Sequence, residues 1–124
     1  MHPTLLCRIA ALAASAWVAL AASPTLAHAI IVEATPQVGA VLHANTVDVR
    51  LRFNSRIDHH RSRLILLDTL GKQTAVKLDD DAPANVITAH ISSLSAGEYR
   101  LRWQVLALDG HITRGDIPFS VTAP

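Results

Sequence analysis

The amino-acid sequence predicts an all-β protein, a single antiparallel β-sandwich of about seven short strands. Apolar residues alternate with charged residues at a period of two in several short stretches, and turn-forming residues separate these stretches. No stretch after residue 27 combines a helical period with helix-capping residues. Many short strands within about 100 residues are typical of a sandwich.

The segment 1–27 is typical of a cleaved secretory signal peptide. Arg8 supplies positive charge, residues 9–22 form an apolar run, and small residues follow in "TLA". The run is about 14 residues long, which is shorter than the roughly 18 to 20 needed to span a bilayer. Cys7 precedes the run, which disfavours a lipoprotein signal. We therefore expect export and cleavage after Ala27.

Cleavage would leave residues 28–124, enough for one hydrophobic core and too few for two domains. The only cysteine and the only methionine of the chain lie before the cleavage point, so the exported domain has no disulfide, thiolate or thioether. Without Arg8, its basic and acidic residues are equal in number. This balance disfavours nucleic acid or an anionic membrane surface as the main partner, because both attract a basic protein.

The first predicted strands follow the alternation directly. Residues 46–53, "TVDVRLRF", place apolar side chains on one face and charged ones on the other, as in a half-buried antiparallel strand. Residues 62–68 are more continuously apolar and predict a buried strand. A turn at Gly71 leads to a return strand at 74–78. Residues 79–85, "DDDAPAN", predict a solvated loop.

Three further strands are predicted toward the C-terminus. Residues 86–92 form the first, and residues 93–108 form a long one whose tyrosine and tryptophan belong to the core. Residues 116–122 close the domain. Pro118 indicates an edge or a bulge there, because proline donates no ladder hydrogen bond. The tripeptide 114–116, "RGD", is interpreted as the turn into this last strand.

Asp109, Gly110 and His111 stand between two of these strands. Asp-Gly between alternating apolar runs is the strongest short signal for a hairpin, so a plain turn is one interpretation. Residues two apart in extended chain also lie on the same side, so Asp109 and His111 can direct a carboxylate and an imidazole at one point. This pair of oxygen and nitrogen ligands suits Cu(II), Zn(II) or Ni(II).

The N-terminus created by cleavage offers further ligands. His28 would present an α-amine and an imidazole, and the two nitrogens can close a chelate ring on a metal ion. The α-amine has a reference pKa near 8, so a metal displaces its proton at neutral pH at modest cost. A chance histidine at this position is the alternative. With Asp109 and His111, His28 completes three nitrogen ligands and one oxygen, the number that suits tetragonal Cu(II).

The exported chain resembles the CopC family of periplasmic copper-binding proteins. The resemblance rests on the "HA" start, an early "ATP" with a following glycine, "VRLRFNSRID" and, most specifically, "LSAGEYRLRWQVLALDGHITRGDIPFSV". It covers essentially all of residues 28–124. It implies a Greek-key sandwich, immunoglobulin-like or cupredoxin-like, that carries copper in the periplasm. It also implies that His28, Asp109 and His111 hold one Cu(II) ion.

Two departures from the family pattern refine this prediction. Some members bind Cu(I) at a site rich in methionine and histidine, but residues 28–124 contain no methionine, so we expect Cu(II) alone. Ser55 stands where some members have an acidic residue, and whether Asp58 compensates is left open. His59 and His60 are interpreted as part of an exposed polar loop rather than a secondary copper site, because adjacent strand residues point to opposite faces.

Two other functions remain as alternatives. Copper held by an N-terminal histidine and a second histidine also resembles the histidine brace of lytic polysaccharide monooxygenases. Oxygen activation there needs an open equatorial position, which Asp109 would fill. A metal-free immunoglobulin-like adhesion module would not bind Cu(II) tightly. We expect a monomer that is not an enzyme, and the resemblance implies delivery of copper to a CopD-type inner-membrane permease or to periplasmic cuproenzymes.

Overall fold

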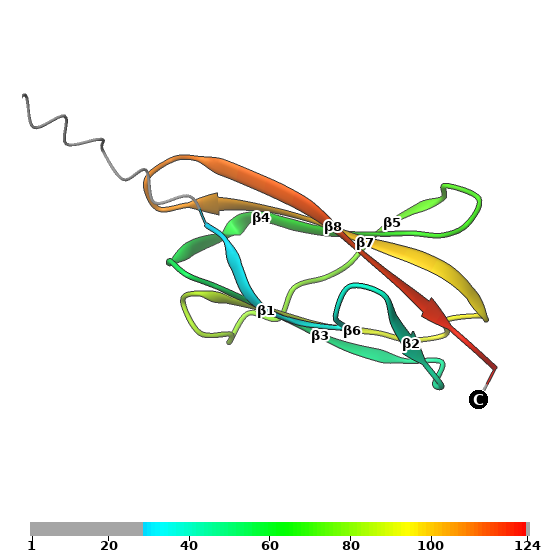
Figure 1. Cartoon of the computed structure of the whole chain (residues 1–124). Helices are drawn as coiled ribbons and strands as arrows, with labels where there is room; N and C mark the ends of the chain where they lie inside the picture. Colours follow the sequence, from blue (N-terminus) through cyan, green and yellow to red (C-terminus); the bar gives the residue numbers. More distant parts are fainter. Residues whose placement is uncertain (1–28, 124) are drawn as a thin grey trace, which may run out of the picture.

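The computed structural model describes residues 29–123, which form two β-sheets packed face to face (Figure 1). The order of strands is β1-β3-β6 in a three-stranded sheet and β2-β8-β7-β4-β5 in a five-stranded sheet. The predicted all-β Greek-key sandwich is confirmed. The strands are β1 (Ile31–Thr35), β2 (Ala40–Leu42), β3 (Val47–Phe53), β4 (Ile57–Leu67), β5 (Gln73–Ala75), β6 (Val86–Ile91), β7 (Gly97–Ala107) and β8 (Ile112–Val121).

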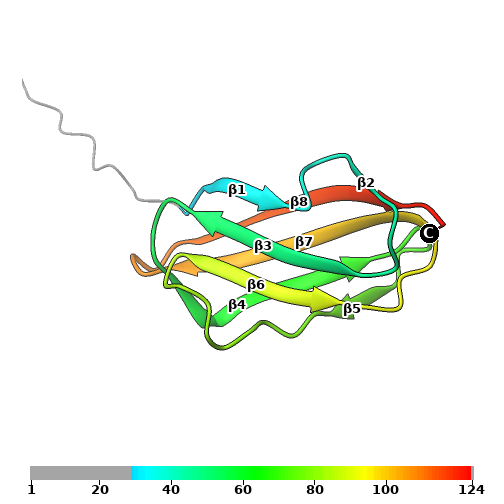
Figure 2. The ribbon, with the colours of Figure 1, turned by 90° about the horizontal axis from the view of Figure 1, so that it is seen from below.

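Within the described chain, only β4–β5 and β7–β8 are hairpins, and every other connection crosses between the sheets. Figure 2 shows the two layers from the side of the three-stranded sheet. Between residues 29 and 123 there is no helix long and apolar enough to cross a membrane. The predicted signal peptide and His28 lie outside the described residues.

Two strands, β1 and β2, were not predicted. The pairing of β1 with β3 shifts register between Ile31 and Glu33, and this bulge breaks the period of two on which the prediction depends. β2 has three residues and pairs in parallel with β8, an exception to the predicted antiparallel arrangement. Both are edge strands, whose single row of partners leaves a weaker sequence pattern.

Two segments predicted as loop or turn belong to strands, which corrects the prediction. The "DHHRSR" segment lies within β4, which begins at Ile57. The tripeptide 114–116 lies within β8, where the ladder with β7 begins at Ile112. The return strand predicted at 74–78 is the shorter β5, and the predicted loop at 79–85 is confirmed.

The core lies between the sheets and follows the predicted alternation of β3 and β7. Leu51 and Phe53 of β3 are fully buried, as are Leu101 and Val105 of β7. Burying one such side chain contributes about 1.5–3 kcal/mol. The rings of Phe53 and Trp103 meet edge to face with centroids 5.4 Å apart, so these two aromatic residues connect the sheets across the core.

Trp103 also explains a glycine in the middle of β8. Gly115 lies directly opposite Trp103 in the β7–β8 ladder. A Cβ atom on Gly115 would lie 2.7 Å from Cζ2 of Trp103, which is closer than real Cβ contacts come. The indole ring therefore lies over bare backbone, and the glycine in "RGD" serves packing rather than a turn.

Pro118 lies where β2 begins to cover β8. The Ala107 N–H donates to the carbonyl of His111, so β8 residues with odd numbers bond to β7 and those with even numbers face away. The carbonyl of Pro118 accepts from the Gly39 N–H at 2.7 Å on that outer side. The N–H that proline lacks would also point outward, so Pro118 removes no bond to β7.

We predict that Gly115→Ala destabilises the domain by about 1–3 kcal/mol, because the added methyl group overpacks against Trp103. Urea unfolding of residues 28–124 measures this change. Ser120→Ala, on the outward face of the same strand, is the control and should change stability by less than about 0.5 kcal/mol. Equal stability of the Gly115→Ala variant and the parent would contradict the packing argument.

Candidate metal centre

The turn between β7 and β8 carries Asp109 and His111. It is closed by two backbone hydrogen bonds, from Ala107 N–H to the His111 carbonyl and from Gly110 N–H to the Ala107 carbonyl, both 2.9 Å. Gly110 has φ +89°, in the left-handed region that glycine adopts without strain. The predicted Asp-Gly hairpin is confirmed.

The carboxylate of Asp109 is positioned by the turn in which it lies. Its Oδ1 accepts the backbone N–H of His111 at 3.0 Å, and its Oδ2 lies 3.2 Å from Nδ1 of the His111 ring. The side chains are 29% and 43% exposed, respectively, and Nδ1 itself is buried. One carboxylate oxygen therefore orients the backbone while the other meets the imidazole.

The spacing of these two atoms suits a proton or a metal ion between them. A carboxylate oxygen and an unprotonated ring nitrogen repel each other unless a cation lies between their lone pairs. Two neighbouring ligands of a tetragonal ion, with bonds of about 2.0–2.1 Å, lie about 2.9 Å apart. The observed 3.2 Å between Asp109 Oδ2 and His111 Nδ1 is close to this value.

The described chain begins at the same end of the sandwich. Ala29 is fully buried in the core, and Ile30 exchanges two hydrogen bonds with Asn54, from N–H to Oδ1 at 2.8 Å and from Asn54 N–H to its carbonyl at 3.0 Å. Ile57, three residues after Asn54, pairs with Ala107 beside the turn. Figures 1 and 2 both show the start of β1 at the end of the β7–β8 hairpin.

Within residues 29–123, no three His, Cys, Asp or Glu side chains are grouped so as to hold a metal ion. Asp109 and His111 are the two predicted ligand residues that lie in this part of the chain. His28, the third predicted ligand residue, lies outside the described residues.

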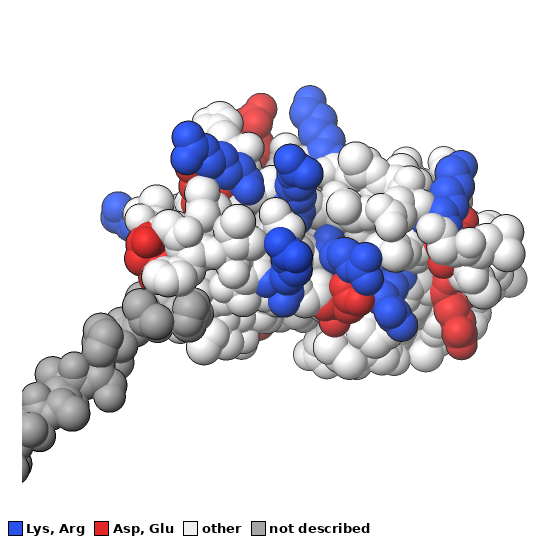
Figure 3. Space-filling model, turned by 90° about the horizontal axis from the view of Figure 1, so that it is seen from above, with Lys and Arg blue, Asp and Glu red and all other residues white. Residues whose placement is uncertain are grey.

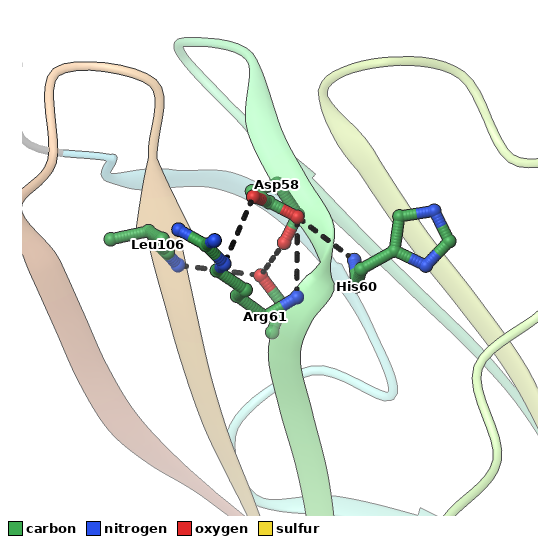
Figure 4. Close-up of polar contacts among 5 residues, drawn as sticks. Asp58, His60, Arg61 and Leu106 are labelled. Carbon is green, nitrogen blue, oxygen red and sulfur yellow. Dashed lines mark hydrogen bonds and ion pairs between the residues drawn. The ribbon is translucent and has the colours of Figure 1, made fainter.

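Asp58 is part of a wide bulge in β4 (Figure 4). The register with β7 passes from Asp58↔Leu106 to Arg63↔Gln104, so the four residues 59–62 lie opposite a single one. The carboxylate Oδ1 of Asp58 accepts hydrogen bonds from two backbone N–H groups, that of His60 at 3.0 Å and that of Arg61 at 3.2 Å.

Ser62 closes the same bulge from inside. Its hydroxyl donates to the carbonyl of Asp58 at 2.6 Å and accepts the N–H of Leu106 at 3.3 Å. The side chain of Ser62 therefore substitutes for a ladder bond that the bulge removes. A serine four residues after an aspartate is too common a pattern to have indicated this in advance.

The two adjacent histidines of the bulge line one depression but differ in their contacts. Nε2 of His59 lies 2.7 Å from the carbonyl oxygen of Val86, while the ring of His60 projects away from Asp58 (Figure 4). Asp58, His59 and His60 consequently do not converge on one point.

The fold and the hairpin define a β-sandwich that brings a carboxylate and an imidazole together in one turn, 3.2 Å apart. Residues 31–122 match the CopC domain. The chain therefore belongs to the CopC family of copper-binding, copper-resistance and copper-transport proteins.

Individual relatives agree with this assignment. The crystal structure of CopC from Methylosinus trichosporium OB3b is 30% identical, with a TM-score of 0.70, over 77% of this chain and 95% of that one. PcoC, a methionine-rich copper resistance protein from Escherichia coli, shares the fold at 24% identity and a TM-score of 0.60, over 77% of this chain and all of PcoC. The copper transport protein CutJ of Bacillus subtilis (strain 168) is 26% identical over 103 residues, which is 78% of this chain but only 18% of CutJ.

We predict that Gly110→Ala lowers the free energy of unfolding by roughly 1 kcal/mol, the cost of a left-handed backbone for a residue with a Cβ atom. No atom lies within 4 Å of that Cβ position, so the loss is conformational rather than steric. Gly110→Asn is the matched variant and should lose less, because asparagine tolerates this region. If urea unfolding showed that the Gly110→Ala variant is more stable than the Gly110→Asn variant, this explanation would be contradicted.

Proposed function

We propose that this protein binds one Cu(II) ion in the periplasm through His28, Asp109 and His111, after cleavage following Ala27. The ligands are the α-amine and imidazole of His28, the carboxylate of Asp109 and the imidazole of His111. The observation that carries the proposal is the 3.2 Å approach of Asp109 Oδ2 to His111 Nδ1 at the end of the sandwich where the described chain begins. Membership of the CopC family supports copper as the ion.

The anchoring of the following residues supports the contribution of His28. Consecutive Cα atoms are about 3.8 Å apart, so residue 28 is one short step from Ala29, which is fixed in the core. The two hydrogen bonds between Ile30 and Asn54 hold the next residue. A ligand at position 28 thus requires little ordering of the chain, and little of the binding free energy is lost to conformational entropy.

The ligand chemistry supports Cu(II) rather than Cu(I). Amine, imidazole and carboxylate ligands suit Cu(II), whereas Cu(I) prefers thioether and thiolate sulfur. Residues 28–124 contain no methionine and no cysteine. PcoC, by contrast, is described as methionine-rich. We therefore assign one Cu(II) ion and no Cu(I) site.

We further propose that the protein is a monomeric carrier or buffer and not an enzyme. With a bound ion, the carboxylate of Asp109 would supply a fourth ligand and would fill the equatorial position that oxygen activation needs open. The similarity to part of CutJ, a copper transport protein, supports transfer of the ion to a membrane permease of the CopD type. Loading of periplasmic cuproenzymes is the second route.

Titration with Cu(II) of protein beginning at His28, compared with protein carrying one extra residue before it, tests this function. We expect one tetragonal site by electron paramagnetic resonance in the first form. The extended form should bind Cu(II) more weakly, because the extra residue removes the chelate that the α-amine of His28 forms. The loss in affinity should exceed the roughly 10- to 100-fold that is typical when a metal site loses an outer-shell partner. Equal binding in competition with a chelator would remove His28 from the site, and no binding in either form would favour the metal-free adhesion module.

The second prediction separates the candidate centre from a similar pair elsewhere. Asp109→Asn retains an oxygen to accept the His111 N–H but loses the negative charge, so Cu(II) affinity should fall at least about tenfold with the fold intact. Asp48→Asn is the matched control, because Asp48 Oδ1 lies 2.6 Å from Nδ1 of His90 on the outer face of the three-stranded sheet. Equal losses in both variants would show that copper binds histidine–aspartate pairs without selection.

A further inference from the structure

The first half of β8 has an open edge. Residues of β8 with odd numbers bond to β7, so the backbone groups of Ile112, Arg114 and Asp116 point to the opposite side of the strand. β2 covers that side only from Pro118 onward. Among residues 29–123, no strand pairs with the edge from Ile112 to Asp116. Three N–H groups and three carbonyls thus face outward in one row, a template for an added strand.

Unpaired positive charge lies beside this edge, on the outer face of the five-stranded sheet. Arg63, Gln104 and Arg114 form one rung across β4, β7 and β8. The two arginines line a depression of about 530 Å³, and neither forms an ion pair with any residue between 29 and 123. Figure 3 looks onto this face and shows basic side chains spread across it.

The one carboxylate in the depression is already bound. Arg102 donates to both oxygens of Asp116, at 2.9 and 3.1 Å, and Arg100 lies 3.6 Å away. The hydrogen bond from Arg102 holds the pKa of the Asp116 carboxyl below its usual range, so Asp116 stays ionised with Arg102 as its partner. Arg63 and Arg114 therefore remain for an outside carboxylate.

The three-stranded sheet shows no such surplus. Its two outward arginines, Arg50 and Arg52, both approach Glu33, the second at 3.0 Å. Although residues 28–124 carry balanced charge overall, Arg63 and Arg114 lie without an ion pair to residues 29–123 on one rung that ends at the open strand edge. Charge and unpaired backbone thus coincide on one side of β8.

We propose that the edge from Ile112 to Asp116 binds an extended, acidic segment of a protein partner as an additional strand. Side chains directly opposite on neighbouring strands have Cβ atoms about 4.5–5.5 Å apart, so a glutamate or aspartate opposite Arg114 pairs with it. Ile112, which is 55% exposed, packs against an apolar residue of the partner strand, two positions from the acidic one and on the same face. Backbone bonds supply affinity, and these two side chains select the sequence.

Other occupants fit the edge less well. Residues 1–27 contain no aspartate or glutamate, so the N-terminal segment cannot supply the carboxylate. A second copy paired antiparallel about Arg114 would set two arginines opposite each other, which is unfavourable. A lipid surface would use the arginines but would leave the row of backbone groups without partners.

The position of this edge gives it a role in the proposed copper transfer. Ile112 directly follows His111, so an added strand ends beside the candidate metal centre. Strand addition itself needs no copper, and it is tested on metal-free protein. Failure of the strand proposal is therefore distinguishable from failure of the copper site.

Nuclear magnetic resonance with a synthetic peptide tests the proposal on the mature protein, residues 28–124. The peptide has about nine residues, in which threonine alternates with either glutamate or valine. At about 3.3 Å per residue it spans the edge. We expect the amides of Ile112, Arg114 and Asp116 to gain protection from hydrogen exchange. The amides of Thr113 and Gly115, already bonded to β7, are internal controls.

Matched peptides and variants separate the two parts of the interaction. Arg114→Glu should weaken binding of the glutamate peptide by roughly three- to tenfold and favour a lysine peptide instead, whereas Lys77→Glu, outside the depression, should change neither. Methylation of alternate peptide nitrogens should abolish binding.

Equal binding of the methylated peptide would overturn strand addition, and equal binding of the lysine peptide by the parent protein would overturn the acidic partner. Self-association through β8 would identify a second copy as the occupant. Binding to phosphatidylglycerol vesicles without binding to the glutamate peptide would make the face a lipid surface. Each of these results contradicts the proposal.

Discussion

The antiparallel pairing of β7 with β8 is the constraint on which most of this protein depends. It runs without a register shift from Gly97↔Val121 to Leu106↔Ile112. Strict alternation along this ladder places Leu101, Trp103 and Val105 in the core and the arginines on the outer face. Because the register is unbroken, the turn that ends it holds Asp109 and His111 in a fixed relation. The core, the basic face and the candidate centre are therefore three consequences of one ladder.

A second constraint joins distant parts of the chain. Burial of Ala29 and the paired hydrogen bonds of Ile30 with Asn54 bring the start of the described chain to the end of the β7–β8 hairpin. Ala29 and Ile30 lie about eighty positions before the turn in the sequence, and the folding of the sandwich brings them close to it. The start of the described chain and the β7–β8 turn meet only in the folded state, so any site that uses both is absent from the unfolded chain. Metal binding there would stabilise the fold.

The sequence predicts those features that arise from local periodicity and misses those that arise from distant contacts. The alternation in β3 and β7 and the Asp-Gly turn are visible in a few consecutive residues, and the structure confirms them. The β4 bulge depends on Ser62 reaching Leu106 on another strand, and the need for glycine at position 115 depends on the indole of Trp103. No local pattern contains this information. The approach of Asp109 to His111 was predictable because only one residue separates them, whereas the part of His28 remains a prediction.

Comparison of two aspartate–histidine pairs shows what distinguishes a candidate centre from a surface contact. Asp48 and His90 approach each other more closely, at 2.6 Å, but their side chains are 89% and 57% exposed near the end of the β3–β6 ladder. Nothing in the described structure orients that carboxylate except the imidazole itself. Asp109, in contrast, is tied through its other oxygen to the backbone of the turn, at the end of the sandwich where the described chain begins (Figure 1). Preorganisation of the carboxylate, in addition to the distance within the pair, favours the hairpin as the candidate metal centre, because ligands already held in place lose little entropy when an ion binds.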